Sequence, residues 1–543
     1  MMKKPRLLAR LAADRRGSIV VPLAVCTGVC LLVVGAGIDY TRAYNVKVDL
    51  QAAVDATALA ANYDSNGLSE AKVKANAEDY FRAIYKGGND EAVDLDVSVV
   101  KGTVTVRAGK TVHTMLGSVM NKSSIDVSVM SQTVVGKATF DVVMVLDNSG
   151  SMAGSKMSTL KDAAEDLTKT LFKINEDGDK KDRVRIGLVP FTSFVNVGTD
   201  KETASWMDRE GRSPIHWKNF ETDGSGKPDT DEFDSKHLVN GKPSRFTLFK
   251  QLKHTNWLGC VEARPMPYDV DDTPPSTSNP ATLFVPEFAP DEPSSANKKW
   301  GDYYYNDYLN DDRGACKKKA KKAYKSSGMN QWEYAQKRLC KYKDQPKSLG
   351  NTWNNGPNYW CKTEPITDLT ESKSTVLAAI KKMKADGHTN IHQGAIWGWR
   401  VLSPSEPFTK GREPKKDSDE EHVRVLIVMT DGENTYQSQS TFNKTRINAY
   451  GYGTEERLGN GVDDYWEIQN KMDERLKLTC TNAKKTGVQV YTVAFQIYNS
   501  GTVSMMRDCA TTASMAFDAK SNGDLTEAFE RIAEEITKLR LQM

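Results

Sequence analysis

The chain has 543 residues, and its 74 Lys and Arg against 71 Asp and Glu give a formal net charge of +3. This length exceeds what one compact core supports, so about two to four domains are expected. The nearly neutral charge gives no reason to expect nucleic-acid binding, and the sequence contains no motif of that class.

An apolar segment follows a basic N-terminal tail. Residues 19–38 carry no charge, and a helix of that length spans roughly 30 Å, the thickness of a bilayer core. The tail contains six basic residues and one acid: Lys3, Lys4, Arg6, Arg10, Arg15, Arg16 and Asp14. The positive-inside rule therefore predicts a cytoplasmic tail at residues 1–18 and an external chain after Asp39. A cleaved signal peptide is the alternative, with GAG at 35–37 as a weak cleavage site, but the length of the run favours an uncleaved, single-pass inner-membrane anchor with most of the chain in the periplasm.

The next segment predicts a small α+β module on a helical stalk, residues 39–138. The membrane helix continues to about residue 62, because the sequence there is rich in Ala and free of Pro and Gly. A second helical pattern covers residues 70–85. Apolar and polar residues then alternate around a Lys-Gly pair over 94–109, which is typical of a hairpin, and 125–135 form a further strand.

From residue 139 the pattern changes to buried strands that alternate with helices. The predicted strands are 140–147, 184–197, 424–431, 488–495 and 515–519, and the predicted helices are 156–174, 372–383, 390–402, 465–487 and 525–541. Continuous apolar strands that alternate with helices predict an α/β fold with a doubly wound, mostly parallel sheet. Asp524 and Glu527 suggest a capping box at the start of the last helix.

A long insertion interrupts this α/β unit. Residues 199–362 are rich in Trp, Tyr, Pro, Gly and Asp and show little periodicity. Because a structureless loop of that length is implausible in a compact domain, we expect an inserted subdomain between a first part, 139–198, and a second part, 363–543. The sequence leaves open whether this insertion covers the functional site or extends it.

Six of the eight cysteines lie beyond the membrane run, and an even number outside the cytoplasm predicts disulfides. Close pairs of the CxxC kind, which a zinc site requires, are absent from the sequence. Cys480–Cys509 is the favoured pair because both residues flank one predicted helix–strand unit. Cys316–Cys340 and Cys260–Cys361 remain as a guess.

Oxygen-bearing side chains gather at three predicted strand ends. Asp147, Ser149 and Ser151 follow the first strand in DNSGSM, Asp431 ends the strand RVLIVMTD, and Thr389 lies in the loop GHTNIHQG. Ligands of an open α/β sheet bind at the carboxyl ends of its strands. Oxygen ligands favour a hard cation, Mg²⁺ first and Mn²⁺ or Ca²⁺ next. Taken alone, DNSGS has an alternative as an Asx-type turn that caps the following helix.

Together these motifs resemble the metal-ion-dependent adhesion site of von Willebrand factor A-type domains, whose first motif is DxSxS. The resemblance covers both parts of the interrupted α/β unit. It implies direct coordination by the hydroxyls of Ser149, Ser151 and Thr389, while Asp147 and Asp431 act mainly through water, or one of them directly. Neutral hydroxyls leave the cation underneutralised, so its open position can bind a carboxylate that a partner supplies.

A second resemblance covers about residues 15–62. RRGSIVVPLAV followed by GAGIDYTRAYNVKVDLQAAVDATALAAN is similar to the TadE/TadG-like segment of tight-adherence (Flp) pilus assembly proteins. Combination with a C-terminal A-type domain is similar to TadG-like proteins. One departure is Pro22, which stands where pilin-like processing after Gly17 favours Glu, and it supports a permanent anchor.

These resemblances imply a non-enzymatic binding function, in assembly or anchoring of a Tad/Flp-type pilus or in adhesion. The expected partner is a protein of the pilus or envelope that offers an acidic side chain, with no nucleic acid and no small-molecule substrate. Two alternatives remain: a metal-dependent envelope hydrolase, and a structural envelope tether. The hydrolase is disfavoured because no general base with a fixed partner accompanies the hydroxyls.

Overall fold

The structure, a computed structural model, describes most of the chain. The described residues are 20–64, 70–86, 93–100, 103–115, 122–134, 138–176, 182–294, 304–311, 316, 328–343, 349–350, 354–413 and 422–542. They fall into two compact units, Met1–Lys137 with Arg540–Met543 and Ala138–Leu539. The basic tail lies outside the described residues.

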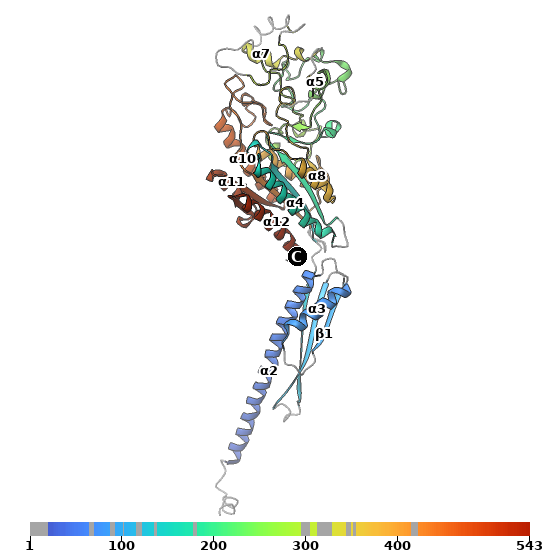
Figure 1. The fold of residues 1–543 in the computed structure, drawn as a ribbon, viewed down its shortest axis with the longest axis vertical. Helices are drawn as coiled ribbons and strands as arrows, with labels where there is room; N and C mark the ends of the chain where they lie inside the picture. The colour runs from blue at the N-terminus through green and yellow to red at the C-terminus, as the bar shows by residue number, and fades with distance from the viewer. Residues whose placement is uncertain are drawn as a thin grey trace, which may run out of the picture. The chain divides into compact units, whose positions relative to one another are not determined.

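The first unit combines a long helix with a small antiparallel sheet (Figure 1). Its elements are α2 (Val20–Asp64), α3 (Glu70–Ile84), β1 (Asp94–Val100), β2 (Thr103–His113) and β3 (Ser124–Val134). The first half of α2 exposes its apolar side chains, from Val21 at 69% to Ile38 at 49%, whereas Leu50 and Val54 further along are fully buried against the sheet. By length and composition α2 is able to cross a membrane. The unbroken helix follows from the absence of helix breakers in its Ala-rich second half.

An eight-stranded mixed sheet forms the centre of the second unit. Its strands are β4 (Thr139–Asp147), β5 (Val184–Phe191), β6 (Val195–Asn196), β7 (Cys260–Val261), β8 (Thr367–Thr370), β9 (His422–Thr430), β10 (Val488–Phe495) and β11 (Ala516–Ala519). They are ordered β11-β10-β9-β4-β5-β6-β7, and β8 pairs antiparallel with β5. The four pairings that join β11, β10, β9, β4 and β5 are all parallel. The predicted A-type fold, a doubly wound and mostly parallel sheet, is confirmed by this order.

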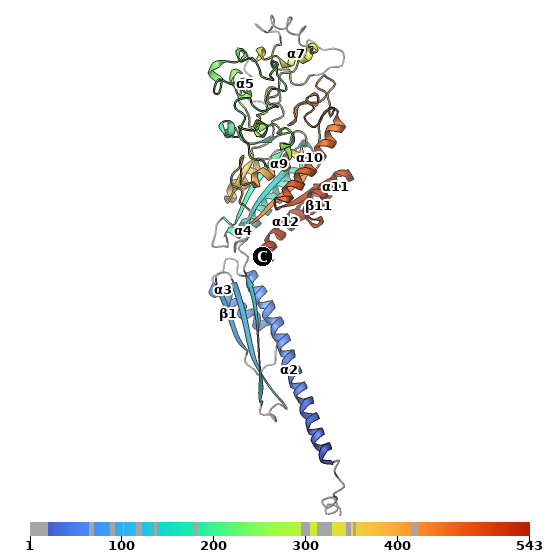
Figure 2. The same ribbon diagram turned by 180° about the vertical axis from the view of Figure 1, so that it is seen from behind.

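Helices cover both faces of the sheet because the central strands are largely buried and carry apolar side chains on both faces. Along β4, Val143 and Val145 contact one core cluster, and Val142, Met144 and Leu146 contact the other. Figure 1 shows α4 (Ser155–Glu176) and α12 (Asn522–Gln542) on the nearer face, and Figure 2 shows α9 (Ile391–Leu402) and α10 (Tyr465–Lys485) on the opposite face. The remaining helices are α8 (Lys373–Lys382) and α11 (Ser500–Cys509).

Three local predictions need correction. The last helix begins at Asn522 because Ser521 and Asp524 form the reciprocal cap: the Ser521 amide donates to Asp524 Oδ2 (3.0 Å), and the Asp524 amide donates to Ser521 Oγ (3.2 Å). The predicted Asp524–Glu527 box is therefore wrong. The predicted strand 184–197 is split, since the chain turns after Phe191 and β6 returns antiparallel. Helix α11, of ten residues, and strand β8, of four, were not predicted.

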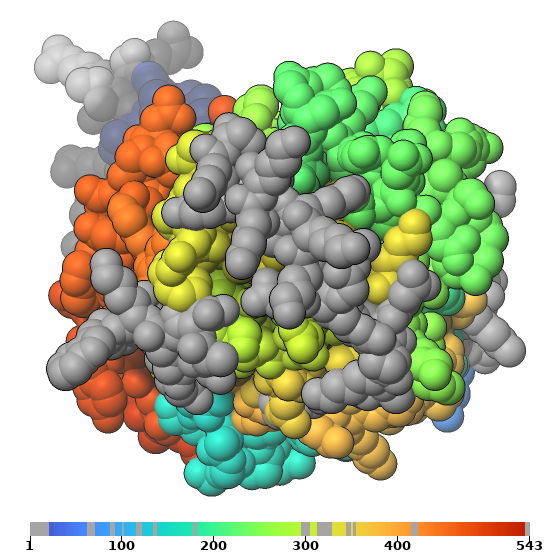
Figure 3. Space-filling model, turned by 90° about the horizontal axis from the view of Figure 1, so that it is seen from above, coloured from blue at the N-terminus to red at the C-terminus, as the bar shows by residue number. Residues whose placement is uncertain are grey.

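The insertion packs onto the A-type core. Its described elements include α5 (Arg245–Gln251) and α7 (Gln331–Lys337), and its aromatic side chains belong to the cluster that also contains Val145 and the α9 residue Trp397. The Phe284 and Trp397 rings lie 4.7 Å apart. Seen from above (Figure 3), the green and yellow insertion lies beside the orange segment that follows β9, and the Ala263 amide donates to the Ala449 carbonyl across this boundary (2.8 Å).

Three disulfides join the expected cysteines. Cys260–Cys361 and Cys316–Cys340 lie within the insertion, and Cys480–Cys509 joins α10 to α11. The favoured pair and the guessed pairs are thus all confirmed. The unpredicted helix α11 explains the third bond, because it brings Cys509 back against the C-terminal part of α10.

Candidate metal centre

Two loops meet at the carboxyl end of β4. The strand ends at Asp147, and the chain turns through a short 3₁₀ helix, Gly150–Met152, before α4. The Gly150 amide donates to the Gly387 carbonyl (3.0 Å), and the Asp386 amide donates to the Asn148 carbonyl (2.8 Å). These backbone bonds hold the DNSGSM turn against the loop that carries Thr389.

Four of the five predicted site residues are linked by hydrogen bonds. The Asp147 Oδ1 atom accepts from the Ser149 amide (2.7 Å), Ser149 Oγ lies 2.9 Å from Ser151 Oγ, and Ser151 Oγ donates to Asp431 Oδ1 (2.6 Å). Asp147 and Ser149 are buried, whereas Ser151 is exposed. The cluster therefore opens to solvent at Ser151.

Thr389 lies at the same opening. A Cβ built on Gly432 would be 3.7 Å from Thr389 Oγ1 and 4.0 Å from Ser151 Oγ, so both hydroxyls flank this glycine. The segment after β9 holds the Thr389 loop: the Thr435 amide donates to the Thr389 carbonyl (2.8 Å), and the Ile391 amide donates to Asn434 Oδ1 (2.8 Å). The structure thus brings together all five residues that the sequence placed on three separate segments.

The buried Asp147 carboxyl is electrostatically unfavourable in its charged form. Burial and the nearby charge of Asp431 raise its pKa to about 6, against hydrogen bonds from Ser149 and Thr430 that lower it. Thr430 Oγ1 donates to Asp147 Oδ2 (2.7 Å). Two carboxylates that lie so close are stabilised by a cation.

Lys156 is a site residue that the sequence did not reveal. Its ammonium lies 2.7 Å from Asp431 Oδ2, and the Asp431 side chain is completely buried. Lys156 lies in the first turn of α4, and the sequence placed it only within a predicted helix. The only signal in the sequence for this contact is that Lys156 lies about one helical turn after DNSGSM.

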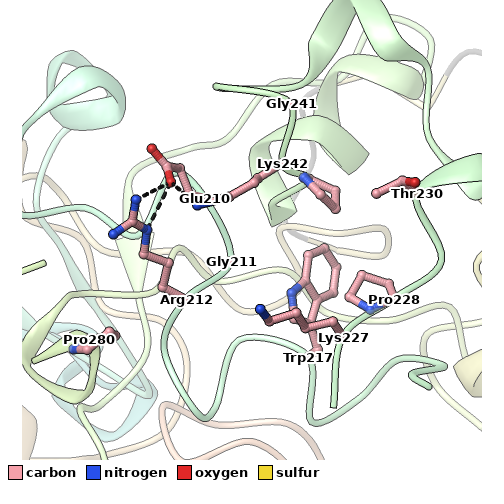
Figure 4. A pocket seen from close by; sticks show the side chains of 11 residues that line it. Glu210, Gly211, Arg212, Trp217, Lys227, Pro228, Thr230, Gly241, Lys242 and Pro280 are labelled. Carbon is pink, nitrogen blue, oxygen red and sulfur yellow. Dashed lines mark hydrogen bonds and ion pairs between the residues drawn. The ribbon is translucent and has the colours of Figure 1, made fainter. Parts of the chain in front are cut away.

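The insertion contains two further features that resemble ligand sites, a cavity and a cluster of cysteine and glutamate side chains. In the insertion, a cavity of about 390 Å³ is lined by Trp217, Pro228 and a charged rim (Figure 4). At the rim Glu210 accepts hydrogen bonds from Arg212, Lys242 and Asn240, which hold the pKa of its carboxyl at about 2 although partial burial opposes this. Most charged groups at this rim are paired with one another, and Trp217 is only 5% exposed. The cavity therefore offers few groups to a ligand.

The second feature is a cluster of Cys260, Glu287 and Cys361, whose side chains lie close enough to ligate a metal ion. Its two sulfur atoms are joined in a disulfide. Because thiolates are the metal-binding form of cysteine, this cluster is not a metal site in the oxidised protein.

One known protein family matches the N-terminal part of the chain. Residues 17–72 match the family model described as "Putative Flp pilus-assembly TadE/G-like". The N-terminal segment is TadE/G-like. The TadE/G-like match includes the whole of α2 and ends in the first turn of α3, in agreement with the resemblance that the sequence showed over residues 15–62. No curated protein matches the chain.

Solved structures similar to the chain include three pilus proteins. They are the pilus adhesin SpaC from Lactobacillus rhamnosus GG (10% identity, 83% of this chain and 35% of that chain, TM-score 0.31), the vWF domain of the type V pili tip protein Mfa5 from Porphyromonas gingivalis (9%, 75% and 97%, TM-score 0.33) and the pilus adhesin RrgA from Streptococcus pneumoniae (11%, 83% and 49%, TM-score 0.30). The chain thus spans about a third of SpaC and half of RrgA. The A-type fold itself is established by the strand order described above.

Proposed function

We propose that this protein is a membrane-anchored, cation-dependent binding protein that acts in assembly or anchoring of a Tad/Flp-type pilus, or in adhesion. One observation carries the proposal: the oxygens of Asp147, Ser149, Ser151 and Asp431 form one connected cluster at the open end of the sheet. The TadE/G-like segment supplies the pilus context.

The cluster fits a hard cation. In an octahedral Mg²⁺ shell with metal–oxygen distances of about 2.1 Å, adjacent ligand oxygens lie about 3 Å apart. The separations of 2.9 Å between the two serine hydroxyls and 2.6 Å between Ser151 and Asp431 are close to this value. Ser149, Ser151 and Thr389 would hold the ion, with Asp147 and Asp431 behind them. A bound Mg²⁺, or Mn²⁺ or Ca²⁺, would attract a carboxylate of a partner protein.

Binding is favoured over catalysis by the contacts of the hydroxyls. Within the described part of the chain, Ser149 and Ser151 bond to each other and to Asp431, and the other oxygen of Asp431 is neutralised by Lys156. A nucleophilic serine requires a free base with a partner that orients it. None of these contacts provides one, so the protein is proposed to bind its partner without turnover.

The anchor of this protein is α2. Its first half exposes apolar side chains throughout, from Val21 to Ile38, and we place it in the inner membrane with the N-terminus cytoplasmic. The three disulfides are consistent with a periplasmic location of the A-type domain and its insertion.

Calorimetric titration of Mg²⁺ into the full chain in detergent micelles tests the cation site. Ser151→Ala and Asp147→Ala are expected to weaken binding at least about tenfold, because each removes an oxygen of the cluster. Asp166→Ala, an exposed carboxylate on α4, is the matched control and should bind as the unchanged chain does. No binding by the unchanged chain at millimolar Mg²⁺ would overturn the proposal.

Pilus assembly and surface adhesion, measured in strains that carry the same variants, distinguish the proposed binding function from the tether and the hydrolase. Loss of pilus assembly or surface adhesion together with Mg²⁺ binding supports the proposal. Assembly that survives the loss of Mg²⁺ binding would favour the tether. Turnover of an envelope polymer that disappears in Asp147→Ala would establish the hydrolase instead.

A further inference from the structure

Aromatic side chains lie exposed beside the proposed metal centre. Trp466 is 68% exposed and Tyr498 is 95% exposed. The other large apolar side chains described as exposed in Ala138–Leu539 are Met266, Tyr305 and Leu478, at 39–41%. Burial of aromatic side chains stabilises a folded chain. Two rings that stay exposed on neighbouring segments therefore indicate a surface for binding rather than for folding.

The chain segments of both aromatic residues bond to Glu433, two residues after Asp431. Asn499, which follows Tyr498, donates from Nδ2 to Glu433 Oε1 (2.8 Å), and Gln469 donates from Nε2 to Glu433 Oε2 (3.0 Å). Trp466 precedes Gln469 by three residues in α10, so both lie on the same face of that helix. The two segments that carry the exposed rings thus converge on one carboxylate.

Tyr465 adds a third ring to the group. Its ring centroid lies 4.8 Å from that of Trp466, in an edge-to-face arrangement. Burial raises the pKa of Tyr465, and the charge of Glu433 contributes to the shift, which agrees with a position near that carboxylate. We call Glu433, Tyr465, Trp466 and Tyr498 the aromatic rim.

The negative charge of Glu433 lacks a cationic partner in the described part of the chain. Its two oxygens accept only from the neutral amides of Gln469 and Asn499, while its side chain is half-buried. A carboxylate attracts a cation through an ion pair, and exposed aromatic rings on the same segments add cation–π attraction, for which Trp is the strongest aromatic partner. The rim is therefore complementary to a Lys or Arg side chain.

We propose that the aromatic rim binds a basic side chain of the same protein partner whose acidic side chain reaches the metal centre. This inference rests on the proposed function and deepens it. The partner segment then carries an acid and a base near each other, and the two charges contact the cation and Glu433 respectively. Aromatic and charged residues of this kind dominate the free energy of protein–protein binding.

Short synthetic peptides with one Asp and one Lys at varied spacing, in otherwise Gly-Ser sequence, provide the probe. In Mg²⁺, the full chain in micelles should bind the best Asp-Lys peptide on the order of tenfold more tightly than its Asp-Gln counterpart, as measured by fluorescence polarisation. Trp466→Ala and Glu433→Gln should each remove most of this preference. Leu478→Ala, a partly exposed side chain further along α10, is the control that should retain it.

Peptides with Lys but no acid, measured in EDTA, separate the rim from the metal centre. Preference for these peptides over Gln peptides should persist in Asp147→Ala and vanish in Glu433→Gln. If Mg²⁺ does not bind but this preference remains, the proposed function fails and the rim stands. Equal binding of Lys and Gln peptides by the unchanged chain, with and without Mg²⁺, would overturn the rim.

Discussion

At the carboxyl end of the sheet, two buried carboxylates are offset by neighbouring cationic and hydrogen-bonding groups. Asp147 is buried where its charge is unfavourable, and Asp431 is buried beside it. Lys156 offsets the second charge from α4, while Thr430 and Ser149 donate hydrogen bonds to the first. Such a cluster is partly neutralised without a metal ion and still offers oxygens to one, which suits reversible cation binding.

The buried ring of His392, three residues after Thr389, should make the free energy of unfolding depend on pH. Its ring is completely buried in α9, and burial lowers its pKa from 6.5 to about 4, with Arg475 and Arg400 opposing its charge and Asp269 favouring it. The folded state therefore binds fewer protons than the unfolded state between these values, so its stability is retained above pH 6.5 and falls as the pH decreases towards 4. The contribution of this residue to the loss is about 3 kcal/mol.

Urea unfolding at pH 7 and pH 4 measures this contribution. In His392→Phe, which keeps a ring but has no titrating group, the difference in unfolding free energy between the two pH values should shrink by about that amount. Absolute stability at pH 7 will also change, because the contact of His392 with Tyr450 is lost, so the comparison is made between pH values. An unchanged difference would contradict the shift.

At the scale of elements, helix α9 positions the Thr389 loop because two glycines let it approach the sheet closely. A Cβ on Gly394 would lie 2.6 Å from Phe191 Cδ1 and 2.9 Å from Val145 Cγ1, and one on Gly398 would overlap Val145 and Leu426. Real side chains do not approach so closely. The glycines therefore set the distance between α9 and the central strands, and with it the position of the loop that precedes the helix.

Gly394→Ala should lower the unfolding free energy by about 1–2 kcal/mol. Overpacking typically costs about 1–3 kcal/mol, which exceeds the gain in helix propensity of about 1 kcal/mol from replacing glycine. Gly523→Ala in the first turn of α12 is the control, because a Cβ there meets only Ser521 Oγ at 3.7 Å. It should be neutral or stabilising, and a loss of equal size in both variants would contradict the packing explanation.

At the scale of the whole molecule, the chain combines two units whose exposed surfaces differ in polarity. The first contains a helix whose apolar side chains are exposed, and the second contains a disulfide-linked domain with a large buried core. Apolar surface on this scale is stable only within a bilayer or against a partner. The second unit, by contrast, buries its own core and has the features of a domain that works in water.

Reporter fusions test the proposed orientation. Alkaline phosphatase fused after Lys137 should be active, because that enzyme folds only outside the cytoplasm, whereas fusion before residue 19 should be inactive. A control with the Lys and Arg residues of the tail replaced by neutral residues should reduce the difference. Activity of the N-terminal fusion alone would place the A-type domain in the cytoplasm.

Local patterns in the sequence were enough to predict most of the individual elements. The long apolar helix and the buried strands with their helices follow from composition, period and spacing. The site of Asp147, Ser149, Ser151, Thr389 and Asp431 was predicted from strand ends together with the resemblance to A-type domains. The motifs also indicated which strand ends carry ligands, because ligand positions in open α/β sheets follow from strand order. The metal ion itself stays a prediction.

Contacts between distant segments could be found only in the folded structure. The ion pair of Lys156 with Asp431 and the hydrogen bonds of Gln469 and Asn499 to Glu433 join segments far apart in the chain. The shared core of the insertion and α9 is of the same kind. Local sequence records the preference of a residue for helix, strand or turn, but a long-range contact depends on how whole elements pack, and no single segment contains that information.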